Sequence, residues 1–149
     1  MRLLDAPLRL RGTVIKGFGR GSRELGIPTA NLDAEALGAA LEGVSAGIYY
    51  GWASVGASPV VHKMVMSIGW NPFFKNERKT VEPHLLHVFP ADFYGEELRL
   101  VVLGYRRPEA SFPSLDSLID AIHADIDAAR GALDEPAAAA GAADPFLQP

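Results

Sequence analysis

The sequence predicts a mainly β domain, a small antiparallel barrel or sandwich, followed by one amphipathic helix. Three observations support this fold class. Short apolar segments rich in β-branched and aromatic residues are separated by frequent glycines and prolines through residue 108. No window between these segments has the length and period of a crossover helix, so the strands should pair mostly antiparallel. A helical period of apolar residues is clear only after residue 114.

Five segments have the composition of β-strands. The first alternates loosely between apolar and polar side chains, and the second is aromatic and β-branched. Residues 56–59 (GASP) lie between the second and third segments and suit a hairpin connection. In chain order, the five predicted strands are 8–16, 47–55, 60–69, 84–89 and 98–105.

The helix is predicted to begin after Ser114, which can cap its first turn, and Asp116 is favourable near the positive end of the helix dipole. Arg130 and Gly131 suit its C-terminal end. Residues 136–149 are rich in alanine and proline, so we expect a weakly ordered tail that follows a domain of residues 1–135. The apolar positions that define the helix are Leu115, Leu118, Ile119, Ile122, Ile126, Ala129 and Leu133.

Composition excludes several classes of protein. A chain of 149 residues that is 48% hydrophobic can form one domain with a substantial core. The formal charge of −4 argues against nucleic acid as a partner, and the absence of cysteine excludes thiolate metal sites and a cysteine nucleophile. The sequence shows neither a secretory signal nor an apolar run long enough to span a membrane. We therefore expect a cytoplasmic protein, monomeric by default, that binds small molecules.

The segment KGFGRGSRELGIPTANL, residues 16–32, has the character of a phosphate-binding loop. Glycines at 17, 19 and 21 allow close backbone approach and expose N–H groups to anionic oxygens, while Lys16, Arg20 and Arg23 add positive charge. The segment lacks the Gly-Lys-Ser/Thr ending of a P-loop. From the residues alone, a solvated basic turn explains it equally well.

Thr29 and Asn31 follow this loop directly. In an extended chain they point to the same face, and their hydroxyl and amide oxygens are hard ligands suited to Mg²⁺. Both side chains are neutral, so such a site needs additional negative charge, which nucleotide phosphates would supply. The alternative is an ordinary turn in which these side chains bind local backbone groups, and spacing alone favours that alternative.

Glu82 is a candidate general base. It lies between Val81 and Pro83, and a carboxylate among apolar neighbours has a raised pKa. The alternative is an exposed glutamate at the end of a basic loop, which lone-residue reasoning favours. His84 and His87 are three residues apart and cannot share one face of a strand, so they do not suggest a zinc pair.

Taken together and in order, six segments resemble the riboflavin kinase family of the eukaryotic single-domain type. The resemblance covers roughly residues 8–133 and implies a closed six-stranded Greek-key barrel with a C-terminal helix. It also implies transfer of the ATP γ-phosphoryl group to the ribityl 5′-hydroxyl of riboflavin, giving FMN and ADP. The segments are GFGRGSRELGIPTAN, GIYYGWASVG, SIGWNPFFKN, TVEPHLLH, DFYGEELRL and GYRRPE.

The resemblance assigns roles around the reaction centre. Thr29 and Asn31 match the family's metal ligands, with Mg²⁺ expected and Zn²⁺ or Mn²⁺ left open. Glu82 matches the catalytic acid that accepts the proton of the ribityl hydroxyl. The glycine loop is expected to arch over the phosphates of ATP or ADP, through Gly17, Gly19, Arg20, Gly21 and Arg23.

The resemblance also assigns the outer parts of the two substrate sites. Leu85, His87 and Tyr94 match positions on the adenine side, and Arg107 and Phe112 match positions that hold the flavin. Ala110 stands where relatives often have a longer polar side chain, so a flavin contact there is limited to the backbone.

Two other functions stay open from the sequence. One is a flavin-binding barrel without catalysis, and the other is a kinase for a different small alcohol. The length of 149 residues also leaves no room for the adenylyltransferase domain of many bacterial relatives, so we expect the reaction to stop at FMN.

Overall fold

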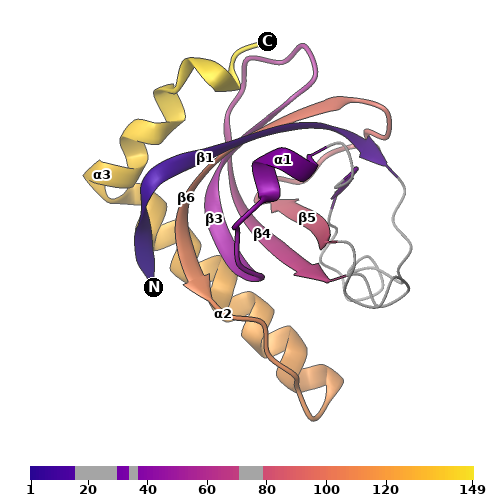
Figure 1. Ribbon diagram of the computed structural model, residues 1–149, viewed down its shortest axis with the longest axis vertical. Helices are drawn as coiled ribbons and strands as arrows, with labels where there is room; N and C mark the ends of the chain where they lie inside the picture. Colours follow the sequence, from indigo (N-terminus) through magenta and orange to yellow (C-terminus); the bar gives the residue numbers. More distant parts are fainter. Residues whose placement is uncertain (16–29, 34–36, 71–78) are drawn as a thin grey trace.

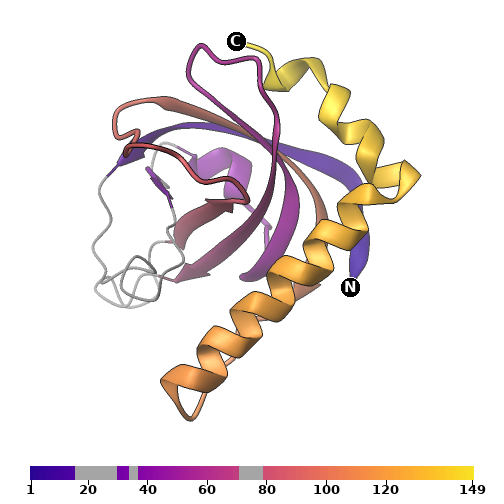
Figure 2. The ribbon, with the colours of Figure 1, turned by 180° about the vertical axis from the view of Figure 1, so that it is seen from behind.

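The computed structural model describes residues 1–15, 30–33, 37–70 and 79–149. In this part of the chain six strands form a closed antiparallel barrel in the order β1-β2-β5-β4-β3-β6, which confirms the predicted fold class (Figures 1 and 2). Because β2 pairs with β5 rather than with β3, the connectivity is of the Greek-key type. The strands are β1 (Arg2–Ile15), β2 (Asn31–Leu32), β3 (Gly47–Val55), β4 (His62–Trp70), β5 (Lys79–Leu85) and β6 (Glu97–Arg107).

The strand predicted at 84–89 is misplaced, because β5 spans Lys79–Leu85 and continues through Pro83. The carbonyl of Pro83 accepts a hydrogen bond from the Ala30 N–H at 2.8 Å, so the backbone polar groups of Pro83 face β2. The missing proline N–H therefore removes no bond between β4 and β5. After Leu85 the chain leaves the sheet in a tight turn, in which the His87 N–H donates to the Leu85 carbonyl at 2.8 Å.

The interior of the barrel is filled by apolar side chains. Short helix α1 (Gly38–Leu41) lies across one end of the barrel in Figure 1, and Leu37 and Leu41 are buried in the same core. A barrel of this size has room inside only for its own side chains, so a ligand site must lie on its outer surface or rim. The fully buried members of this core include Leu10, Met64, Met66, Ile68, Val81, Leu98, Leu100 and Val102.

A second apolar core lies between the outer face of the barrel and helix α2 (Leu115–Asp134), which runs along the barrel in Figure 2. The Ser114 side chain accepts the Ser117 N–H at 3.1 Å, which confirms the predicted cap. The helix continues past Gly131, where the sequence suggested its end. Leu133 is completely buried, and this burial outweighs the cost of one glycine, about 1 kcal/mol in a helix interior.

Residues 136–149, expected from composition to be a weakly ordered tail, contain regular helical turns in the structure. The chain continues as α3 (Pro136–Ala139) and two 3₁₀ turns, η2 (Ala140–Ala143) and η3 (Pro145–Leu147), which pack against the barrel (Figure 1). The Trp52 indole donates to the Ala138 carbonyl at 2.9 Å, and Arg9 forms an ion pair with Asp144 at 2.8 Å. Leu147 is fully buried. The alanine-rich composition of this segment gave no sign that Leu147 would be buried.

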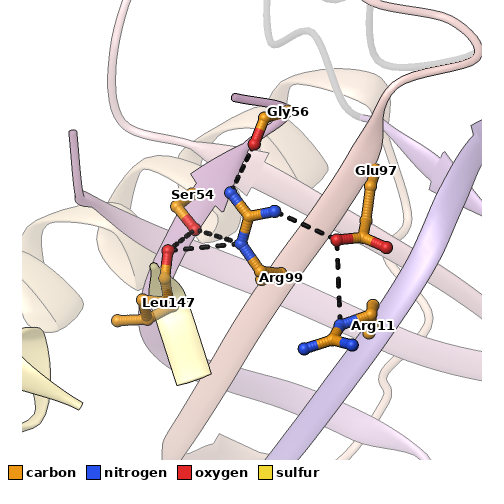
Figure 3. Close-up of polar contacts among 6 residues, drawn as sticks. All are labelled: Arg11, Ser54, Gly56, Glu97, Arg99 and Leu147. Atoms are coloured by element: carbon orange, nitrogen blue, oxygen red, sulfur yellow. Dashed lines mark hydrogen bonds and ion pairs between the residues drawn. The ribbon is translucent and has the colours of Figure 1, made fainter. Parts of the chain in front are cut away.

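A buried arginine joins this tail to the barrel (Figure 3). Arg99 on β6 is 2% exposed, and its Nε donates to the Ser54 hydroxyl at 3.0 Å and to the Leu147 carbonyl at 3.2 Å. Its other nitrogens donate to Glu97 at 3.0 Å and to the Gly56 carbonyl at 2.6 Å. A buried guanidinium is tolerated only when its donors have hydrogen-bond partners, and the Leu147 carbonyl of the tail is one of these partners.

Leu147→Ala is expected to lower the free energy of unfolding by about 2–4 kcal/mol, because it leaves a cavity in the second apolar core. Urea denaturation followed by circular dichroism measures this change. Gln148→Ala, at the exposed neighbouring position, is the matched control and should change stability little. Equal effects of the two variants would contradict the packing of the tail.

Candidate active site

One row of residues crosses four neighbouring strands on the outer face of the barrel. Ser67 on β4 is paired with Glu82 on β5 and with Ile48 on β3, and Ile48 is paired with Arg107 on β6. Residues directly opposite each other in antiparallel strands lie on the same face of the sheet. Glu82 and Arg107, predicted to serve different ends of a substrate, therefore belong to one surface.

Asn31 extends this row onto β2. Leu32 is paired with Val81, and the Ala30 N–H donates to the Pro83 carbonyl, so Asn31 lies opposite Glu82 between these two contacts. Side chains in such a position have Cβ atoms about 5 Å apart. The structure thus brings together Asn31 and Glu82, which the sequence predicted as a metal ligand and a base.

Glu82 is held at a boundary between core and surface. Its neighbours Val81 and Pro83 point into the barrel and are buried, so the alternation of the strand turns Glu82 outward, where it is half-buried. Burial raises the pKa of the Glu82 carboxyl, and the nearby Glu109 carboxylate raises it further. A carboxylate with a raised proton affinity can accept a proton from an alcohol more readily than an ordinary glutamate.

Glu109 belongs to this group, although sequence reasoning gave it no role. It follows β6, and its carboxylate lies over Gly69 on β4. A Cβ atom added at Gly69 would stand 2.3 Å from Glu109 Oε1 and 3.7 Å from Thr80 Oγ1. Gly69 therefore leaves the space that the second carboxylate occupies. No periodicity or spacing in the sequence indicates this contact, because it joins a loop to a distant strand.

Arg107 and Phe112, the predicted flavin residues, are close to each other. The Arg107 guanidinium carbon lies 5.6 Å from the centroid of the Phe112 ring, a cation–π arrangement. Arg107 also forms an ion pair with Asp125 of helix α2 at 2.8 Å. Ala110, which lies between Arg107 and Phe112 in the chain, is exposed.

The predicted adenine-side residues lie at the end of β5 and in the segment after it. Leu85 is buried in the barrel core, so only its backbone is available to a ligand, whereas His87 and Tyr94 are exposed. The His87 ring lies 4.6 Å from the ring of His62 and 4.8 Å from that of Phe89, measured between centroids. His62, which the sequence did not single out, is half-buried, and burial together with His87 lowers its pKa.

Several predicted residues lie outside the described part of the chain. These are the glycine-loop residues and one metal-ligand candidate: Gly17, Gly19, Arg20, Gly21, Arg23 and Thr29. Among the described residues, no group of three or more histidine, cysteine, aspartate and glutamate side chains is arranged to hold a metal ion. Nor does any helix in these same ranges have the length and apolar character needed to cross a membrane.

Comparisons with known proteins agree on one family. The family profile described as Flavokinase: Riboflavin kinase matches residues 4–133. Riboflavin kinase of Mus musculus is 55% identical over 130 residues, 87% of this chain and 83% of the mouse protein. The bifunctional riboflavin kinase/FMN phosphatase of Arabidopsis thaliana is 57% identical over 141 residues, 95% of this chain but 37% of that protein. The crystal structure of riboflavin kinase from Trypanosoma brucei is similar with a TM-score of 0.74 at 32% identity, covering 96% of this chain and 88% of that one.

Glu82→Gln is expected to raise the free energy of unfolding at pH 7. The folded chain holds the Glu82 proton to higher pH than the unfolded chain, whose carboxyl has an ordinary pKa near 4.5. Ionisation therefore favours unfolding above that pH, and the neutral amide removes the penalty. Urea denaturation between pH 4 and pH 8 measures the effect, which should vanish at the acidic end. Glu42→Gln, at an exposed position, should show no comparable gain.

Proposed function

Because this chain belongs to the riboflavin kinase family, we propose that it transfers the γ-phosphoryl group of ATP to the ribityl 5′-hydroxyl of riboflavin, giving FMN and ADP. The observation that supports this function best is the outer-face row that runs from Asn31 through Glu82 to Arg107. It combines a hard oxygen ligand, a carboxylate with a raised pKa and a planar cation on one surface.

The length of the row suits this acceptor. Three strand spacings separate Glu82 on β5 from Arg107 on β6, which corresponds to about 14 Å at roughly 4.8 Å per spacing. Riboflavin has a primary alcohol at one end of an extended chain and a flat ring system at the other. An alcohol at Glu82 and a ring at Arg107 and Phe112 would match the two ends of the row.

In this proposal Glu82 is the general base. Its carboxylate orients the primary hydroxyl and accepts its proton as the oxygen attacks the γ-phosphorus. Phosphoryl transfer has a loose transition state, so the enzyme contributes mainly alignment and charge stabilisation, and a positioned base typically adds about 10²–10⁴-fold. The raised pKa of Glu82 makes it a better proton acceptor, and activity should decline as the pH falls through that pKa.

Asn31 and Thr29 would hold the divalent cation, with Mg²⁺ as the expected ion. The amide oxygen of Asn31 is a hard ligand beside the Glu82 carboxylate, which fits such an ion in donor chemistry. When bound, the cation neutralises charge on the nucleotide phosphates. Thr29 and Asn31 are both neutral, so affinity for the cation should depend strongly on the nucleotide.

The nucleotide would lie beyond the end of β5. His87 offers an exposed ring there and Leu85 offers backbone groups, and the exposed ring of Tyr94 would add a further contact. The glycine-loop residues Gly17, Gly19, Arg20, Gly21 and Arg23 would contact the phosphates. At the opposite end of the row, Arg107 and Phe112 would contact the flavin ring, with Ala110 contributing its backbone.

Two alternatives are separated from this function by one assay. The protein is incubated with Mg·ATP and a panel of alcohols that includes riboflavin, and ADP and phosphorylated products are measured. A carrier would quench flavin fluorescence without releasing ADP, and a kinase for another alcohol would phosphorylate a different panel member. Absence of FMN with riboflavin would contradict the proposed function.

Glu82→Gln is expected to reduce turnover by at least about 10²-fold while riboflavin affinity changes only a few-fold, because the amide cannot accept the proton. Steady-state FMN formation and flavin fluorescence titration measure the two quantities. The acidic decline of the pH–rate profile should also disappear. Near-normal turnover of this variant would remove Glu82 from the mechanism.

Asn31→Ala is expected to shift the Mg²⁺ dependence of turnover to higher concentration at fixed ATP, because one of two proposed protein ligands is lost. A Mg²⁺ titration of FMN formation measures the shift. Asp33→Ala, two residues away on the same short segment, serves as the control. An unchanged titration for Asn31→Ala would rule out its assignment as a ligand.

A further inference from the structure

The carboxylate of Asp125 on helix α2 accepts hydrogen bonds from two consecutive arginines of β6. The aspartate is 3% exposed, yet its side chain accepts three hydrogen bonds. Arg107 donates to it through Nε at 2.9 Å and Nη2 at 2.8 Å, and Arg106 donates through Nε at 3.2 Å. The contact with Arg107 is bidentate, which fixes the plane of the guanidinium as well as its position.

A β-bulge makes this arrangement possible. Consecutive residues of a regular strand point to opposite faces, so Arg106 and Arg107 should not reach one carboxylate. Ile48 is paired with Arg107 whereas Tyr49 is paired with Tyr105, which leaves Arg106 as an extra residue in β6. The bulge turns both side chains toward α2. It lies at the point where β6 ends and the segment to Phe112 begins.

The Arg107 side chain is constrained on three sides. Asp125 takes its Nε and Nη2, the Pro108 carbonyl accepts from its Nη1 at 3.1 Å, and Phe112 lies beside its face. The buried carboxylate is shared with Arg106, so it compensates part of the charge of the Arg107 guanidinium. Arg107 therefore acts less as a free cation than as a flat, fixed surface, which suits an aromatic ring better than a mobile anion.

We propose that Asp125 is a positioning residue for the acceptor substrate, which fixes Arg107 in the orientation that receives the flat ring. This inference rests on the proposed function, in which Arg107 contacts the flavin. Without the carboxylate, the long Arg107 side chain populates several rotamers. Binding of the riboflavin ring must then select one of them, which costs side-chain entropy and weakens affinity. The cost falls on the acceptor, because none of the residues proposed to contact the nucleotide is among the partners of Arg107.

The test is Asp125→Asn, which keeps the size of the side chain but removes its charge and one acceptor. We expect the Kd for riboflavin, from flavin fluorescence quenching, to rise about tenfold, while the KM for Mg·ATP stays within about twofold. Asp127→Asn, an exposed position on the same helix, is the matched control and should change neither value. An unchanged riboflavin Kd, or an equal rise for both substrates, would overturn the proposal.

Two further measurements exclude a merely structural effect. Asp125→Glu keeps the negative charge, so the chain should still fold. The longer side chain displaces the Arg107 guanidinium, and the Kd for riboflavin should again rise while the KM for Mg·ATP does not. In a double-mutant cycle with Arg107→Gln, the losses in riboflavin affinity should be strongly non-additive, whereas additive losses would contradict action through Arg107. FMN formation by the unaltered protein tests the proposed function separately, since the inference depends only on ratios of affinity between variants.

Discussion

The filled interior of the barrel is the constraint on which the rest of the structure depends. A closed barrel of six strands has space inside for its own apolar side chains, so chemistry must be arranged on the outer face. That face is organised by antiparallel pairing, which fixes the order of residues across strands. Asn31, Glu82, Ser67, Ile48 and Arg107 form one line because each is opposite the next. The register of the sheet is therefore also the geometry of the site.

The outer face serves two purposes at once. Part of it is covered by α2 and the C-terminal segment, which form a second core, and part of it carries the candidate site. A buried charged side chain lies at each of two contacts between the barrel and this second layer. Arg99 joins the barrel to the last turn of the chain, and Asp125 joins helix α2 to the end of β6. Each pairs a charge with a partner distant in sequence, so the second layer both stabilises the barrel and orients residues at its edge.

Local signals in the sequence predicted much of this structure. The barrel class, β3 and the cap at Ser114 follow from alternation, period and capping chemistry. The candidate site was predicted less from physics than from a combination of motifs, because Asn31 and Glu82 meet only through strand pairing. Glu109 and Asp125 escaped prediction for the same reason. From the sequence, Asp125 resembles an ordinary solvent-exposed aspartate on a helix. It can be buried only because a bulge in β6 brings two arginines close to it. At Pro83 and in the alanine-rich C-terminal segment, tertiary contacts outweigh the local preferences of the residues.

The closure between β1 and β6 has a consequence for biosynthesis. Arg2 is paired with Tyr105 and Gly12 with Leu98, so β1 can pair with β6 only after the four strands between them in the chain have been synthesised. The Leu147 carbonyl that Arg99 requires emerges later still. Such non-local pairing makes for slow folding, and the nascent strands expose unpaired edges in the meantime. The barrel should therefore close only after synthesis has passed β6, and the donors of the buried Arg99 side chain are fully satisfied only once residue 147 has been made.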